Sequence, residues 1–246
     1  MLLFAQLAFF WLNSGLLPAG LSAPPAGLTL RVEPVFGATP LVLDSAAYRT
    51  KPYERLAITR LRFYLSHIVL TYTDGRCYTE PASYHLVDAD PEAAASLNVV
   101  LPNAPAGSLR SLTFSVGVDS AANVAGALGG DLDPGRGMYW AWHSGYVHAK
   151  LEGHAPALAT PHHEFAYHLG GFAAPCNALR TCTLAVPAAM AATRTLTLRA
   201  DVARWLDALP LAQEPSVMVP GPAAMRAADA CARMFTLLVP PAHARR

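Results

Sequence analysis

Short segments in which apolar and polar residues alternate recur along most of the chain, and prolines or glycines separate them. The clearest segment runs from Leu112 to Val118, and similar ones run from Leu28 to Val32 and from Leu196 to Val202. This period of two is typical of half-buried strands, and 21 Pro and 17 Gly residues supply the turns between them. The pattern predicts a mainly β fold.

The segment from Ile58 to Tyr72 is the longest strand pattern, and its apolar residues change phase within it. They occupy odd positions up to Leu65 and even positions from Ile68 onward. Such a change is typical of a β-bulge, which here falls at Ser66-His67. We therefore expect His67 to be turned either toward a site or toward solvent.

Aromatic, thioether and imidazole side chains are densest between Met138 and Gly153. This stretch contains two of the four tryptophans, Trp140 and Trp142. Its second half alternates like a half-buried strand, which predicts His148 on the same face as Lys150. The residues alone leave two interpretations open, a core strand with an aromatic corner or a metal site.

A long loop from Asp119 to Gly137 precedes that stretch, and structureless loops of this length are usually functional. Near the end of the chain, Pro222 opens a helical pattern that runs from Ala223 to Arg233. No linker divides residues 24–246. We expect a single domain with long loops and a short C-terminal helix.

Residues 1–23 have the features of a signal peptide. Leu2 to Leu17 is a largely apolar run, and Leu21-Ser22-Ala23 has the small-residue pattern of a signal-peptidase site. The basic residues that usually precede such a run are missing, and an uncleaved anchor is the alternative. We expect cleavage after Ala23 and a mature protein in the periplasm or outside the cell.

The chain has four cysteines, an even number that in an exported protein predicts two disulfides. Cys176 and Cys182 flank a short loop and are the preferred pair, which leaves Cys77 with Cys231. Other pairings remain open. A zinc site is the weaker interpretation because the chain has no CxxC pair.

Composition and missing motifs exclude several classes of function. The formal net charge is +1 and charged residues make up 14%, so no basic surface for nucleic acid is indicated. The chain lacks a GxSxG elbow, a Walker loop, a dinucleotide-binding fingerprint and an HExxH motif. No nucleophile–base pair is recognised, so we do not expect an enzyme.

What remains is a set of His, Met and Trp side chains in an exported, strand-rich chain. Imidazole and thioether donors together favour copper, above all Cu(I), over calcium or magnesium. The candidate ligands are the following residues: Met138, His67, His85, His143, His148, His162, His163 and His168.

Several motifs occur in order along the chain and together resemble those of one family. They include Arg60 to Ile68, Tyr84 to Asp88, Gly117 to Ser120, Met138 to Trp142 and His168 to Gly171. With Leu132-Asp133-Pro134, Gly145-Tyr146 and Lys150 to Gly153 they are similar to the MbnP family, including members called metallo-mystery-pair proteins with a four-cysteine motif. The resemblance extends from about Leu28 to Phe235.

The resemblance implies a periplasmic, β-sandwich-like protein that binds copper. It also implies a partner, a MauG-like di-haem enzyme of the cytochrome c peroxidase type, that oxidises a tryptophan to kynurenine near the metal. Carried over by motif, that tryptophan is Trp140 or Trp142. His168 is the histidine of the HLGG motif, and we expect His85 and Met138 to be further members of the site.

Two positions depart from the family pattern as we know it. His143 and His148 stand where a small polar residue and an aromatic residue are more usual. These additional imidazoles are expected to enlarge or relocate the copper site.

Two other classes of function compete with copper binding. In the first, an extracellular β-sandwich binds carbohydrate or peptide on an aromatic platform of Trp140, Trp142 and Tyr146. In the second, a metal-dependent hydrolase uses a face formed by His162, Glu164 and His168, which would need an open metal position with a bound water.

Overall fold

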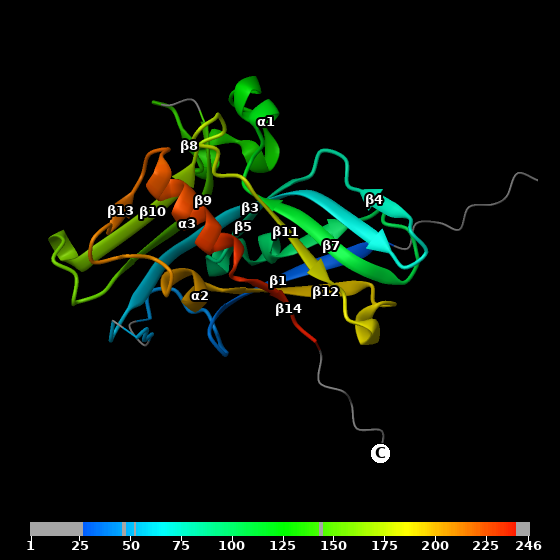
Figure 1. Cartoon of the computed structure of the whole chain (residues 1–246), viewed down its shortest axis with the longest axis horizontal. Coiled ribbons are helices and arrows are strands. Elements are labelled where there is room, and N and C mark those ends of the chain that lie inside the picture. The colour runs from blue at the N-terminus through cyan, green and yellow to red at the C-terminus, as the bar shows by residue number, and fades with distance from the viewer. Residues whose placement is uncertain (1–26, 46–47, 52, 143–144, 240–246) are drawn as a thin grey trace, which may run out of the picture.

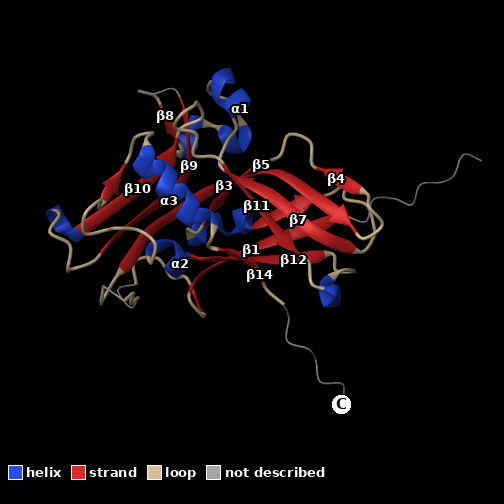
Figure 2. Cartoon of the chain, in the orientation of Figure 1, coloured by secondary structure: helices blue, strands red, loops and turns tan. Residues whose placement is uncertain are grey.

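The computed structural model describes residues 27–45, 48–51, 53–142 and 145–239 and is mainly β, as predicted (Figures 1 and 2). The predicted signal peptide lies outside the described residues. Among the helices of the described chain, none is long and apolar enough to cross a membrane.

Most of the strands are short, and they are separated by turns and single helical turns. The strands are β1 (Leu28–Phe36), β2 (Thr39–Pro40), β3 (Ala57–Tyr72), β4 (Cys77–Thr79), β5 (Tyr84–Asp88), β6 (Asn98–Leu101), β7 (Leu109–Val116), β8 (Tyr139–Trp140), β9 (Gly145–His154), β10 (Glu164–Gly170), β11 (Arg180–Ala185), β12 (Thr195–Asp201), β13 (Ser216–Val217) and β14 (Phe235–Leu237). The helices are α1 (Ser120–Ala125), α2 (Val202–Leu206) and α3 (Pro222–Ala232), with 3-10 turns η1 (Pro91–Leu97), η2 (Gly130–Leu132), η3 (Pro134–Arg136), η4 (Pro161–His163) and η5 (Ala188–Met190).

Two sheets form the sandwich. The smaller has the order β14-β12-β1-β2, with β6 also paired to β1, and the larger has the order β11-β7-β3-β9-β10-β13. In the larger sheet β4 and β5 pair with β3, and β8 pairs with β9. Figure 1 shows β1, β12 and β14 along one side of the molecule, with the larger sheet spread across it.

The main core lies between the sheets and beneath α3. Leu61, Phe63 and Leu65 of β3 point into it, as do Ile68 and Leu70 after the register shift between Ser66 and Val69. The phase change read from the sequence is therefore a bulge, as predicted, and His67 has a left-handed backbone with φ of 50°. The even-numbered side chains before the bulge point to the opposite face of the larger sheet, here called the outer face.

The predicted loop from Asp119 to Gly137 contains more structure than the sequence indicated. It begins with α1, in which the Asp119 carboxylate accepts a hydrogen bond from the Ala122 N–H as an N-cap, and continues through η2 and η3. The expected strand from Met138 to Gly153 is divided into β8 and β9. Both changes bring the loop over the outer face of the larger sheet.

Candidate metal and aromatic site

A second apolar cluster lies on the outer face, under the loop that contains α1. We call it the outer cluster, and it consists of Tyr64, Leu86, Val118, Ala122, Leu132, Met138, Trp140, Tyr146 and Val147. Two tyrosine hydroxyls attach the loop to it. The Tyr64 hydroxyl donates to the Asp131 carbonyl at 2.9 Å, and the Tyr146 hydroxyl lies 3.0 Å from the carbonyls of Gly126 and Leu132.

The two tryptophans of the sequence motif are in contact at the edge of this cluster. Their ring centroids lie 5.4 Å apart, with 40° between the planes. Trp140 is 6% exposed and Trp142 is 64% exposed. The pair therefore connects the buried cluster with the surface of the protein.

Gly170 of the HLGG motif provides the surface on which Trp140 packs. A Cβ atom at Gly170 would lie 2.5 Å from the Trp140 ring, so no other residue fits there without displacement. His168 lies two residues earlier on β10, and strand alternation places it on the same outer face. Met138 and Trp140 belong to the outer cluster, and His168 projects from the same face of the larger sheet.

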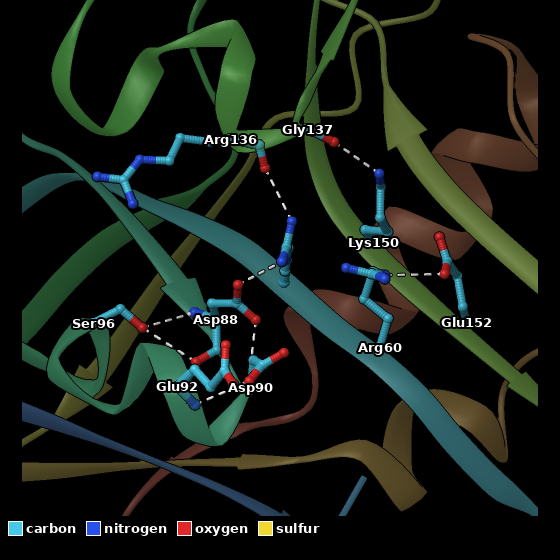
Figure 3. A network of polar contacts seen from close by, with 10 residues as sticks. Arg60, Asp88, Asp90, Glu92, Ser96, Arg136, Gly137, Lys150 and Glu152 are labelled. Atoms are coloured by element: carbon cyan, nitrogen blue, oxygen red, sulfur yellow. Dashed lines mark hydrogen bonds and ion pairs between the residues drawn. The ribbon is translucent and has the colours of Figure 1, made fainter. Parts of the chain in front are cut away.

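The His168 ring is oriented by a carboxylate. Its Nε2 lies 2.7 Å from Oε1 of Glu152, whose other oxygen accepts a hydrogen bond from Arg60 Nε at 3.1 Å. Figure 3 shows Arg60 and Glu152 reaching toward each other across neighbouring strands. The hydrogen bond from His168 lowers the pKa of Glu152 to about 2, and Arg60 adds to this effect against the partial burial of the carboxylate.

His67 is held at the other side of the loop. Its Nε2 lies 2.9 Å from Oδ2 of Asp119, and the same oxygen accepts a hydrogen bond from the Tyr84 hydroxyl. Partial burial opposes ionisation of Asp119, but the hydrogen bonds from Tyr84 and Ala122 and the His67 ring together lower its pKa. Burial and the Asp119 carboxylate raise the pKa of Tyr84 to about 12.

His85 lies in a different environment on β5. Its Nε2 is 2.8 Å from Oε2 of Glu80, and the ring lines a cavity of about 620 Å³ with Arg62 and Asp88. The three partly exposed candidates on the strands, His67, His85 and His168, therefore share one feature. A carboxylate binds Nε2 in each case, and when Nε2–H donates to it the lone pair of Nδ1 is left available.

The position of His148 differs from the prediction that it shares a face of the strand with Lys150. Alternation placed it beside Lys150, but it is 1% exposed and lies beneath α3. The register explains the difference, because Leu169 pairs with Ala149 and Gly170 pairs with Val147, which leaves His148 as an extra residue in β9. A bulge of this kind leaves no trace in the polar pattern of the sequence.

The other candidate ligands do not converge on the outer cluster. His143 lies outside the described residues. His162 and His163 lie in η4 rather than on a strand, and with Glu164, His154 and Arg55 they line a surface pocket of about 380 Å³. The face of His162, Glu164 and His168 predicted for a hydrolase is not formed, since His168 instead binds Glu152.

The described part of the chain contains no group of three or more His, Cys, Asp or Glu residues arranged to hold a metal ion. A copper site built from the described residues of the outer cluster would need a donor of another kind, such as the Met138 thioether. The platform predicted for carbohydrate or peptide is also incomplete, because Trp140 and Tyr146 are buried and only Trp142 has an exposed ring.

The predicted disulfides are not formed, since all four cysteines are free thiols. Cys77 is exposed on β4 while Cys231 is buried in α3, so this pair is separated by its place in the fold. The Cys182 thiol points toward the Ala232 carbonyl, 3.5 Å away, next to Cys231. Short sequence spacing was therefore a poor guide to which thiols are neighbours.

Comparison with known proteins agrees with the motifs and the fold. The model of the MbnP family matches residues 25–219, which is most of the chain. The chain belongs to the MbnP family. No curated protein sequence matches it.

Among solved structures, MbnP from Methylosinus trichosporium is similar to this chain, with a TM-score of 0.52 and 17% sequence identity. The match covers 81% of this chain and 82% of that one. At this level of identity the likeness shows the fold, which is thus the fold of an MbnP protein. Assignment of individual site residues has to come from the geometry of this chain.

Proposed function

We propose that this MbnP-family protein is exported, binds copper at the outer cluster and is the substrate of a MauG-like di-haem enzyme. That enzyme oxidises Trp140 or Trp142 to kynurenine. The observation that supports the proposal is the contact between Trp140 and Trp142, with Trp140 packed on Gly170 and clustered with Met138. The carboxylate-oriented imidazole of His168 lies on the same face of the sheet.

The donors available on the outer face fit copper. A thioether and an imidazole are ligands that copper accepts, and a carboxylate on the second ring nitrogen is the usual support of a metal-binding histidine. His168 and Met138 are the residues that would hold the ion. Bound copper would supply redox chemistry next to an electron-rich indole.

The two indoles differ in how accessible they are to a partner enzyme. Trp142, at 64% exposure, is the ring that an approaching partner protein can contact. Trp140 is buried against Gly170 and is in ring contact with Trp142. Opening either indole to kynurenine needs an oxidant, here a peroxide used by the di-haem enzyme, which inserts two oxygen atoms across the C2–C3 bond. Water then removes C2 as formate, and a carbonyl and an aniline nitrogen remain at the outer cluster.

Copper titration of the mature protein tests the metal part of this proposal. His168→Ala is expected to lose the copper that the wild type binds at the outer cluster, and Met138→Leu is expected to weaken it. His162→Ala, an exposed histidine in η4, is the matched control and should keep wild-type affinity. Equal copper binding by His168→Ala and the control would contradict the assignment.

A further inference from the structure

His148 is a buried imidazole with few polar surroundings: burial lowers its pKa more than the backbone of Ala178 raises it. Both of its ring nitrogens are inaccessible to solvent, and neither makes a hydrogen bond of good geometry. Leaving buried polar groups without a partner is costly, so such a group calls for an explanation. Burial lowers the pKa of His148 to about 4, so the ring is neutral and has a lone pair to donate.

The fold makes room for this ring at one particular place. Gly117 has a φ of 116°, and a Cβ atom there would lie 2.6 Å from the imidazole. The bulge in β9 then turns the ring under α3, between β7 and β10. Two features of the fold therefore position the His148 ring: the missing Cβ atom of Gly117 and the bulge in β9.

A small cavity adjoins the ring. Its volume is about 10 Å³, close to what one water-sized particle occupies, and Cys231 of α3 lines it together with His148. The other walls are mostly apolar, with Val116, Leu169 and Ala228 among them. Arg180 also borders it, but its guanidinium is engaged by Asp229 and by the carbonyls of Asn177 and Met225.

We propose that His148 and Cys231 form a buried two-coordinate site for Cu(I). One imidazole nitrogen and one thiolate sulfur flank a space for a single ion, and both are donors that Cu(I) accepts. Binding replaces the thiol proton: Cys231–SH and Cu⁺ give Cys231–S–Cu and a released H⁺, with no change of oxidation state.

Charge explains why a monovalent ion fits this place. Cu⁺, a thiolate and a neutral imidazole sum to zero charge, which an apolar interior tolerates. Zn²⁺ would leave one positive charge uncompensated, and structural zinc sites take four ligands, which the described residues do not provide here. The site is separate from the outer cluster and does not depend on the function proposed for it.

The test is anaerobic titration of the reduced, full mature protein with Cu(I) against a chromophoric chelator. The wild type is expected to bind one equivalent more than either Cys231→Ala or His148→Gln. Cys77→Ala, which removes an exposed thiol, is the control and should bind as much as the wild type. In the same titration His168→Ala reports on the outer cluster, so loss of one site is distinguishable from loss of the other.

X-ray absorption on His168→Ala, Met138→Leu protein loaded with Cu(I) gives a readout that does not depend on the stability of the cavity variants. One sulfur and one nitrogen neighbour are expected. Equal Cu(I) stoichiometry in Cys231→Ala and wild type, or absorption data without a Cu–S neighbour, would overturn the proposal. A Cys182–Cys231 disulfide in the native protein, seen as a mass deficit of two hydrogens, would overturn it as well.

Discussion

At the scale of single residues, two glycines provide the space that two buried aromatic rings occupy. Gly117 admits the His148 ring and Gly170 admits the Trp140 ring. The HLGG motif indicated Gly170 through the family resemblance, whereas nothing in the sequence indicated that Gly117 lies against an imidazole. Contacts between residues distant in the chain cannot be read from periodicity.

Gly117→Ala is expected to destabilise the protein strongly. The positive φ costs about 1–3 kcal/mol for a residue with a Cβ, and overpacking against His148 adds about 1–3 kcal/mol. Gly126→Ala is the matched control, because Gly126 also has a positive φ but has open space around it. Urea unfolding should show a clearly larger loss for Gly117→Ala, and equal losses would contradict the contact with His148.

The Glu152 carboxylate gives the protein part of its acid stability. Its pKa is about 2 in the folded protein, against 4.5 ordinarily, so the unfolded chain takes up the proton first as the pH falls. This contribution is complete above pH 4.5 and is lost between there and about 2. Glu152→Gln should therefore show a shallower loss of stability over that range.

Urea unfolding across the acid range measures this effect. Glu164→Gln, at the exposed start of the same strand as His168, is the control and should keep the wild-type slope. An unchanged slope in Glu152→Gln would mean that the contact between His168 and Glu152 does not hold the carboxylate ionised in solution.

At the scale of elements, the strands were easier to predict than the loop that crosses them. The phase change at Ser66-His67 indicated the bulge in β3, because one face of that strand is fully apolar on each side of it. The bulge in β9 was missed, since its neighbours on both faces are buried and no alternation marks it. The loop from Asp119 to Gly137 has no periodic pattern, and its course is set by tyrosine hydroxyls on other elements.

Tyr146→Phe is expected to loosen this loop. The hydroxyl accepts a hydrogen bond from the Leu128 N–H at 2.9 Å as well as contacting two carbonyls, and its loss leaves these groups without that partner. We expect a cost of about 1–3 kcal/mol and faster amide exchange over residues 126–132.

Tyr64→Phe is the matched control for this change, because its hydroxyl makes a single bond to the Asp131 carbonyl. It should cost about 0.5–1.5 kcal/mol and leave the exchange near Leu128 largely unchanged. Equal effects of the two variants on that exchange would show that the Tyr146 hydroxyl does not hold the loop.

At the scale of the whole molecule, the sequence predicted the fold and the family, whereas the set of residues that forms the site stays a prediction. Met138, Trp140 and His168 lie on one outer face because β8, β9 and β10 are neighbours there. His148 was expected with them but lies beneath α3, while His85 lies on β5 beside Glu80 and shares a cavity with Leu86 of the outer cluster. The sequence motifs identified the candidate site residues. Which of these residues share a face depends on the order of the strands in the sheet, which the motifs do not give.

The most direct test of the account is the mass of the peptide 137–150 from protein co-expressed with its di-haem partner. Trypsin releases this peptide between Arg136 and Lys150, and it contains both Trp140 and Trp142. Conversion of one indole to kynurenine adds about 4 Da to it, and fragmentation at Ala141 assigns the modified ring. We expect this gain in copper-containing protein and its absence from the double variant Trp140→Phe, Trp142→Phe. An unmodified peptide from copper-containing wild-type protein that was co-expressed with the di-haem enzyme would contradict it.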